Sequence, residues 1–383
     1  MQLSRLTLRA HLVDELLPLW ARHGLDRERG GYWNRLGPDL APRPDGHKRL
    51  LVHTRQLFSF TRGVELGGGE AAREAAAHGL AFLRERFWDA RHGGWFTTSD
   101  EAGAPLDRRK DLYGHAFAIF ALAHHARVFG EPASLRLARE TLELLRARLR
   151  DPVAGGFFEG ASEDWQPLHG PRRQNPHMHL VEALLELDEV APDAGALAEA
   201  NALVGLLATR WLDARTGALV EHFDPGWQPL PGEAGRAIEP GHHFEWAWLL
   251  DRLAAREPDG PARGLADRLL AFGRRCGVDA DGGVFDQVDR EGRLLLSTKR
   301  LWPQTERVKA LAARARGSGA GDATARAELE AGLRYCFARH VDPKTRGWHE
   351  HLARDGRVLS DAQNATSVYH VVLALDEASR ALD

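Results

Sequence analysis

The sequence predicts an all-α fold, an (α/α)6 barrel in which six helix pairs close into a ring with short β-hairpins on the loops at one mouth. A glycine followed by two mostly apolar or aromatic residues recurs six times, at intervals of 63, 62, 61, 66 and 64 residues. Two helical patterns separate successive copies. Six periods of about 63 residues account for the chain, so we expect one catalytic domain spanning residues 1–383.

The glycine motif is typical of a small hairpin. Most copies follow an Asp-containing turn cluster and precede a second turn, such as Asp224-Pro225-Gly226. Short aromatic runs bounded by turn residues read as short paired strands. The six copies are Gly31-Tyr32-Trp33, Gly94-Trp95-Phe96, Gly156-Phe157-Phe158, Gly217-Ala218-Leu219, Gly283-Val284-Phe285 and Gly347-Trp348-His349.

The helical segments between the motifs are of two kinds. The segments 70–88 and 133–149 carry apolar residues on one face and charges on the other, as surface helices do. Their successors are apolar nearly all round, which predicts burial. An open solenoid remains the alternative, but it needs polar capping repeats, whereas a ring leaves no end. The apolar segments are 113–128, 177–187, 244–253 and 368–375.

Composition excludes several classes of function. The 54 acidic and 51 basic residues give a net charge of −3, so we expect neither nucleic acid nor an anionic membrane as partner. No apolar run reaches about 18 residues, which argues against a membrane span or signal peptide. Two cysteines, Cys276 and Cys336, indicate a reducing compartment, and we expect a cytoplasmic monomer or homodimer.

Polar residues recur within the inner helical segments. Five of them follow one another at intervals of 64, 63, 64 and 64 residues, and Arg55 or its neighbour His53 holds the corresponding place in the first repeat. In a closed ring, equivalent positions lie at equal height, so these side chains are expected to meet at one mouth. Buried charge is costly unless it is paired or used, which favours a function for the set. The five are His115, His179, His242, Glu306 and His370.

Helix-start signals indicate which mouth holds the site. Asn175-Pro176, Pro240-Gly241 and Trp302-Pro303 each precede one of the polar residues, and proline is tolerated in a first helical turn. Several helix N-termini then face the site and favour an anionic intermediate. Near His115, Tyr113 is an alternative cavity residue. The remaining histidines are expected to be structural or to support the site: His53, His124, His125, His177 and His243.

Three chemistries fit such a set of residues. Histidines with Glu245 or Glu306 could bind a metal, although Arg55 would be a poor neighbour for a cation. Hydrolysis by paired carboxylates has only Glu245 and Glu306 available. Histidines near neutral pKa are suited to moving a proton beside a carbonyl, with Arg55 stabilising an enediolate. Aldose–ketose isomerisation or 2-epimerisation needs these groups, and we expect neither metal nor cofactor.

The chain also resembles the N-acylglucosamine 2-epimerase superfamily, and within it the mannose isomerase-like members. The resemblance runs through essentially the whole chain and implies an (α/α)6 barrel with cofactor-free proton transfer at C2 of a free sugar. The segments that carry it are His53-Thr54-Arg55-Gln56, Asp111-Leu112-Tyr113-Gly114-His115-Ala116-Phe117, Asn175-Pro176-His177-Met178-His179, Pro240-Gly241-His242-His243-Phe244-Glu245-Trp246 and Val368-Tyr369-His370.

The resemblance implies a role for each matched residue. His242 and His370 correspond to the acid/base pair, Glu245 to the carboxylate that orients His242, and Arg55 with His179 to the groups that hold the enediolate. The expected reaction turns D-mannose into D-fructose: His242 assists ring opening, His370 removes the C2 proton, and C1 is reprotonated. A sugar 2-epimerase and a non-catalytic sugar-binding ring stay as alternatives. The expected sugar contacts are Tyr113, Asn175, Arg236, Trp302 and Glu306.

Overall fold

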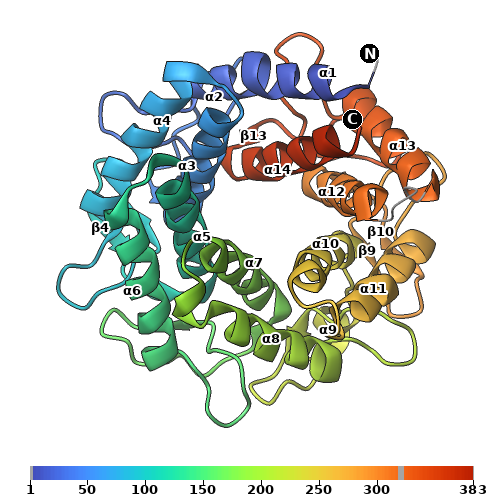
Figure 1. Cartoon of the computed structure of the whole chain (residues 1–383). Helices are drawn as coiled ribbons and strands as arrows, with labels where there is room; N and C mark the ends of the chain where they lie inside the picture. The colour runs from blue at the N-terminus through green and yellow to red at the C-terminus, as the bar shows by residue number, and fades with distance from the viewer. Residues whose placement is uncertain (1–2, 318–322, 383) are drawn as a thin grey trace.

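The computed structural model describes residues 3–317 and 323–382, which form a ring of inner helices surrounded by a ring of outer helices (Figure 1). This is the predicted (α/α)6 barrel. Each inner helix packs against the inner helices before and after it, and against its outer neighbour. The inner helices are α3 (Leu50–Glu65), α5 (Leu112–Phe129), α7 (Gln174–Val190), α10 (Pro240–Arg256), α12 (Leu301–Gly317) and α14 (Ala365–Ala381).

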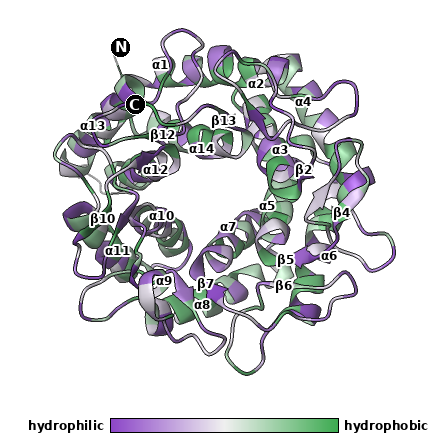
Figure 2. Ribbon diagram, turned by 180° about the vertical axis from the view of Figure 1, so that it is seen from behind, coloured by the Kyte–Doolittle hydropathy of each residue, from purple (hydrophilic) through white to green (hydrophobic). Residues whose placement is uncertain are grey.

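Several outer α-helices are shorter than the inner ones, in part because the chain continues from them into a π-helical turn. The first outer element is continuous, from α1 (Arg5–Ala10) through a π turn to α2 (Leu17–His23). Hydropathy colouring shows mainly apolar residues along the inner helix α5 (Figure 2). The other outer helices are α4 (Gly69–Phe82), α6 (Pro132–Arg148), α8 (Ala196–Leu206), α11 (Ala262–Cys276) and α13 (Ala323–Arg339), and a short helix α9 (Gly232–Arg236) precedes α10.

Short strands join each repeat to the next. A two-residue strand runs directly into most inner helices and pairs antiparallel with a hairpin strand of the following repeat. These strands therefore mark the mouth at which the inner helices begin (Figure 2). The pairs are β2 (Lys48–Arg49) with β3 (Thr98–Ser99), β5 (Lys110–Asp111) with β6 (Gly160–Ala161), β7 (Arg172–Arg173) with β8 (His222–Phe223), and β11 (Lys299–Arg300) with β12 (His351–Leu352).

Three further strand pairs complete the hairpin side. β3 also pairs with β4 (Pro105–Asp107), and β9 (Gln287–Val288) pairs with β10 (Leu294–Leu296). The last strand, β13 (Gln363–Asn364), pairs with β1 (Arg35–Leu36) of the first repeat, and α14 packs on α3. The same link that joins consecutive repeats thus closes the ring between the two ends of the chain.

A buried hydrogen bond attaches five of the hairpins to the fourth residue of the inner helix, and the sixth hairpin to Gln363 of β13 just before α14. The imidazole Nε2 of His53 accepts the backbone N–H of Tyr32 at 3.0 Å, and its Nδ1 lies 2.9 Å from the carbonyl oxygen of Arg49. The hairpin glycine has to be a glycine because a Cβ on Gly31, whose φ is +74°, would lie 2.3 Å from that Nε2. The acceptors in the six repeats are His53, His115, His177, His243, Gln304 and Gln363.

This series corrects the prediction for His115. Its Nε2 accepts the Trp95 N–H at 3.0 Å and its Nδ1 lies 2.7 Å from the carbonyl oxygen of Asp111, so both ring nitrogens are used by the backbone. Burial lowers the pKa of His115 to about 3, and its ring stays neutral. His115 therefore holds a hairpin and contributes no side chain to the mouth.

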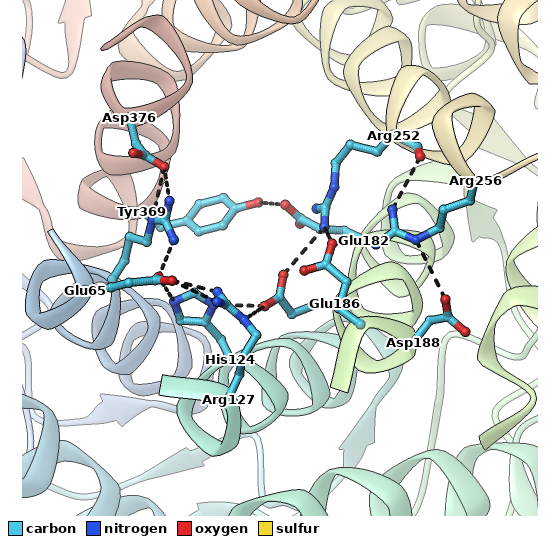
Figure 3. A network of polar contacts seen from close by, with 12 residues as sticks. Glu65, His124, Arg127, Glu182, Glu186, Asp188, Arg252, Arg256, Tyr369 and Asp376 are labelled. Carbon is cyan, nitrogen blue, oxygen red and sulfur yellow. Dashed lines mark hydrogen bonds and ion pairs between the residues drawn. The ribbon is translucent and has the colours of Figure 1, made fainter. Parts of the chain in front are cut away.

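At the opposite mouth the inner helices end in a network of ion pairs (Figure 3). Arg62 of α3 donates from Nε to Asp376 of α14 at 3.0 Å. Glu186 of α7 lies 2.9 Å from Nδ1 of His124 on α5, and Arg252 of α10 lies 3.5 Å from the same carboxylate. Each of these three contacts joins two neighbouring inner helices, so the network clamps the ring at the end remote from the hairpins.

The hairpin bond can be tested at His115. His115→Leu leaves the buried Trp95 N–H without an acceptor and should lower the free energy of unfolding by about 1–3 kcal/mol. His115→Gln keeps an acceptor of the kind that Gln304 and Gln363 supply, and should lie closer to the unchanged protein. Urea unfolding measures both. Equal stability of the two variants would show that the bond contributes nothing.

Candidate active site

The sixth residue of every inner helix faces the barrel axis. One shared position was predicted for His115, His179, His242, Glu306 and His370. His242 is instead the third residue of α10, and His115 is the fourth of α5. Residues at the same position of successive inner helices are 61 to 66 residues apart. Residues chosen at a constant interval of 63 or 64 therefore came from three different helix positions. The sixth residues are Arg55, Phe117, His179, Glu245, Glu306 and His370.

Four of these six, Arg55, His179, Glu245 and His370, line a cavity of about 240 Å³ at the hairpin mouth. Eight of the ten predicted site residues line it, including Tyr113, Asn175 and Trp302 from the second positions of their helices. A second cavity of about 370 Å³ adjoins it and shares Arg55, Arg300, Trp302 and His370. The first cavity is lined by Arg55, Tyr113, Arg173, Asn175, His179, Glu221, His222, Glu239, His242, Glu245, Arg300, Trp302 and His370.

His370 lies between a carboxylate and a guanidinium. Its Nδ1 is 2.7 Å from Oε1 of Glu306, and NH1 of Arg55 donates to its Nε2 at 3.2 Å. Burial, reinforced by the positive charges of Arg55 and Lys309, lowers the pKa of His370 well below 6.5. His370 is therefore a neutral base whose Nε2 lone pair faces the cavity. Glu306 itself is fully buried beneath it and does not line the cavity.

His242 has the opposite protonation state. Burial alone would lower its pKa, but the Glu221 carboxylate 2.9 Å from its Nδ1 raises the pKa to about 9. The same carboxylate accepts a hydrogen bond from Gln174 at 2.8 Å. His242 is thus an imidazolium near neutral pH, and its Nε2–H is left for the cavity. The indole of Trp302 contacts both catalytic candidates, with ring centroids 4.8 Å from His242 and 6.0 Å from His370.

Glu245 does not orient His242 as expected. Its carboxyl instead lies among the sixth residues, where Oε1 is 3.8 Å from Nε2 of His179. Burial, with the Glu306 carboxylate nearby, raises the pKa of Glu245 to about 8, so it is a neutral acid near pH 7. It therefore offers the cavity a hydroxyl donor, and Glu221 takes the orienting position that the sequence analysis assigned to Glu245.

His179 is a neutral acceptor beside Arg55. Its Nδ1 is 2.9 Å from Oε2 of Glu182, and although that carboxylate favours the charged ring, burial lowers the pKa of His179 to about 4. With the proton on Nδ1, Nε2 can accept a hydroxyl hydrogen. Glu182 is held in turn by the phenol of Tyr369 at 2.5 Å.

Two groups of side chains in this region have the composition of a metal site. His179, Glu182 and Glu245 form one, and Glu245, Glu306 and His370 the other. However, the Lys309 ammonium lies 2.6 Å from Glu306 and 3.9 Å from Glu245. A metal ion would have to compete with this fixed cation. The absence of a metal requirement stays a prediction.

Of the remaining residues predicted to contact the sugar, Tyr113 and Asn175 line the cavity and Arg236 does not. NH2 of Arg55 donates to the Tyr113 hydroxyl at 2.8 Å, and the buried Oδ1 of Asn175 has no hydrogen-bond partner among residues 3–317 and 323–382, so it is ready to accept from a ligand. Arg236 is different. It is the last residue of α9, its side chain is exposed to solvent, and it lines neither cavity.

Three functional groups were missed by the sequence analysis. Glu221 follows the fourth hairpin motif and carries no periodic signal. Glu182 and Lys309 did carry a periodic signal. Each is the ninth residue of its inner helix and comes three residues after the sixth residue, which faces the axis. On a helix this spacing places two side chains on the same face, so both were within reach of sequence reasoning.

A model of one protein family matches most of the chain. The model, described as N-acylglucosamine 2-epimerase (GlcNAc 2-epimerase), matches residues 31–374. The chain belongs to this family. The expected family resemblance is thereby confirmed, and the chain is an enzyme of the sugar isomerase and epimerase kind.

Individual relatives carry names of both kinds. A protein named mannose-6-phosphate isomerase from Rhizobium meliloti (strain 1021) is 36% identical, covering 96% of this chain and 94% of its own. A D-mannose isomerase from Thermobifida fusca is 29% identical over 85% of this chain and 82% of its own. The solved cellobiose 2-epimerase from Spirochaeta thermophila DSM 6192 superposes with a TM-score of 0.89, at 26% identity over 99% of this chain and 96% of that one.

Across residues 3–317 and 323–382, no helix combines the length and apolar character that crossing a membrane requires.

The partner of His242 can be tested by titration. Glu221→Gln removes the carboxylate that holds the imidazolium, so the pKa of His242 should fall from about 9 to below 6.5 because burial then dominates. Histidine NMR measures this pKa directly. The raised pKa stabilises the fold below pH 6.5, and this contribution is lost as pH rises through about 9. A His242 pKa unchanged in Glu221→Gln would contradict the assignment.

Proposed function

We propose that this enzyme interconverts an aldose and its ketose, with D-mannose and D-fructose as the pair, by cofactor-free transfer of a proton between C2 and C1. The observation that carries the proposal is the opposite protonation of two histidines on one cavity, neutral His370 and charged His242, with Arg55 beside the neutral one. Titrating groups whose pKa values are driven apart are how one site supplies both a base and an acid.

The proposed reaction follows from these states. His242 donates its Nε2 proton to the ring oxygen and takes the proton of the anomeric hydroxyl in return, which opens the pyranose to the aldehyde. Nε2 of His370 then removes the C2 proton, and Arg55 stabilises the charge that develops on the enediolate oxygens. His179 accepts the hydroxyl proton of O2, which returns to O1, while His370 returns its proton to C1. The sugar gains and loses no atoms.

We propose an unphosphorylated sugar, although the Rhizobium relative is named for a phosphorylated one. A phosphate group is recognised by cations free to bind it. Here NH2 of Arg173 is 2.7 Å from Glu159, and Arg300 is 3.0 Å from both Glu239 and Asp286. Both arginines are already committed to carboxylates, which supports a neutral substrate.

The adjoining cavity of about 370 Å³ favours a second candidate, 2-epimerisation of a disaccharide. That cavity has room for a second sugar next to Trp302 and His370. In this candidate His242 delivers a proton to the face of C2 opposite His370. The two candidates use the same residues and differ in which carbon is reprotonated.

The product decides between them. Incubation with D-mannose in D₂O should yield D-fructose carrying deuterium, because the base that moves the proton exchanges with solvent. D-mannose 6-phosphate should be a poorer substrate, and EDTA should have no effect. Cellobiose converted to its 2-epimer with no fructose from mannose would favour the second candidate. If the protein forms neither product and incorporates no deuterium into the sugar, it is a binding protein.

The acid/base pair can be tested by truncation. His242→Ala and His370→Ala should each lower kcat by about 10²–10⁴-fold, the usual contribution of a general acid or base. His115→Gln is the matched control, since it changes a buried histidine that only holds a hairpin. Circular dichroism verifies the fold of each variant. Full activity of His242→Ala or His370→Ala would overturn the assignment.

We also propose that the enzyme works in the reducing cytoplasm, as a monomer or a homodimer. The two cysteines are free, which fits such a compartment.

A further inference from the structure

Lys309 is a buried ammonium that the proposed reaction does not use. It is fully inaccessible to solvent, one helical turn below Glu306 on α12. Its Nζ lies 2.6 Å from Oε2 of Glu306, 3.9 Å from Oε1 of Glu245 and 4.0 Å from the ring centroid of Trp248. Taking a charge out of water costs several kcal/mol, so a lysine at the axis of the barrel calls for an explanation.

The Glu306 carboxylate connects Lys309 to His370. Its Oε2 faces the ammonium, and its Oε1 faces Nδ1 of His370 at 2.7 Å. On the other side of the imidazole, Arg55 donates to Nε2. A neutral imidazole carries one N–H, and only a proton on Nδ1 satisfies both neighbours.

We propose that Lys309 is a positioning residue: its ammonium keeps Glu306 ionised, and the ionised Glu306 holds the proton of His370 on Nδ1, which leaves Nε2 open as the base. The inference rests on the proposed role of His370. Arg55 cannot set this tautomer throughout the reaction, because its guanidinium turns to the sugar oxygens when the enediolate forms. Glu306 is then the group that decides where the proton lies.

Removing the Lys309 ammonium would reverse the direction of the hydrogen bond between Glu306 and Nδ1 of His370. Burial already raises the pKa of Glu306, and Lys309 is the neighbour that most opposes this rise. Without it, Glu306 would take up a proton and donate to Nδ1, so the imidazole proton would move to Nε2 and no base would face the sugar. The charged and titratable groups around Glu306 are Lys309 on its own helix, Glu245 on α10, Glu182 and His179 on α7, and His370 on α14.

The test is Lys309→Met, which keeps an unbranched side chain, one heavy atom shorter, and removes its charge. At neutral pH kcat should fall by about 100-fold or more, as for loss of a general base, with little change in KM. Activity should recover as pH rises, because alkali ionises Glu306 again. Nitrogen-15 NMR of labelled histidines should show His370 with its proton on Nε2 in the variant and on Nδ1 in the unchanged protein.

Lys48→Met is the matched control. Lys48 is 1% exposed and its Nζ lies 2.8 Å from Asp26 in a hairpin outside the site. Its loss should lower thermal stability while leaving the pH profile and the His370 tautomer unchanged. Lys309→Arg should keep the Nδ1 tautomer because the cation remains.

Two results would overturn the inference: an Nδ1 tautomer with an unchanged pH profile in Lys309→Met, or an Nε2 tautomer in the unchanged protein at neutral pH. The second measurement needs no variant and holds even if Lys309→Met does not fold. Full turnover by His370→Ala would instead defeat the proposed function, while the NMR result would still report on Lys309. The two failures are therefore distinguishable.

Discussion

Closure of the ring is the constraint on which the site depends. Arg55 comes from the first inner helix and His370 from the last, yet a guanidinium nitrogen of one lies 3.2 Å from an imidazole nitrogen of the other. This contact exists because α14 packs on α3 and β13 pairs with β1. An open arrangement of the same repeats would separate the base from the group that stabilises its product. The bonds that hold each hairpin to its helix keep the remaining side chains at the same height.

The axis tolerates so many buried ionisable groups because their charges compensate one another. The charges of Glu182 and Glu306 are both opposed by Lys309, and Glu245 avoids a third negative charge by keeping its proton. Glu221 adds one more pair with His242. The compensation also diversifies the site: otherwise similar histidines become a charged acid, a neutral base and a neutral acceptor according to their partners.

Much of this architecture is encoded in patterns that a single sequence displays. The repeated glycines predict the hairpins, and the alternation of amphipathic and apolar segments predicts two concentric rings of helices. The site was found less completely. His115 and His179 look alike in sequence but occupy the fourth and sixth residues of their helices, and a displacement of two residues turns a side chain from the axis to the hairpin. Variable loop lengths hide that difference.

Electrostatic pairing was hardest to foresee. His242 owes its charge to Glu221, a residue 21 positions earlier on the hairpin that packs against α10, whereas Glu245 at a helical spacing of three offered the simpler explanation. Spacing along a helix predicts which side chains can come into contact. Which of them form a hydrogen bond depends on side-chain directions that the whole ring determines. Arg236 illustrates the same limit, because its side chain is exposed to solvent and lines neither cavity.

The pairing of β13 with β1 has a consequence for biosynthesis. A growing polypeptide folds from its N-terminus, and neighbouring helix pairs can stack as they leave the ribosome. Arg55 emerges early, but its neighbour His370 is made only after nearly all other repeats. Until then the first inner helix exposes a flank that only the final one covers. Chemical competence is therefore acquired late and in a single step, so a nascent chain with five of its six repeats would carry most of the pocket and none of its base.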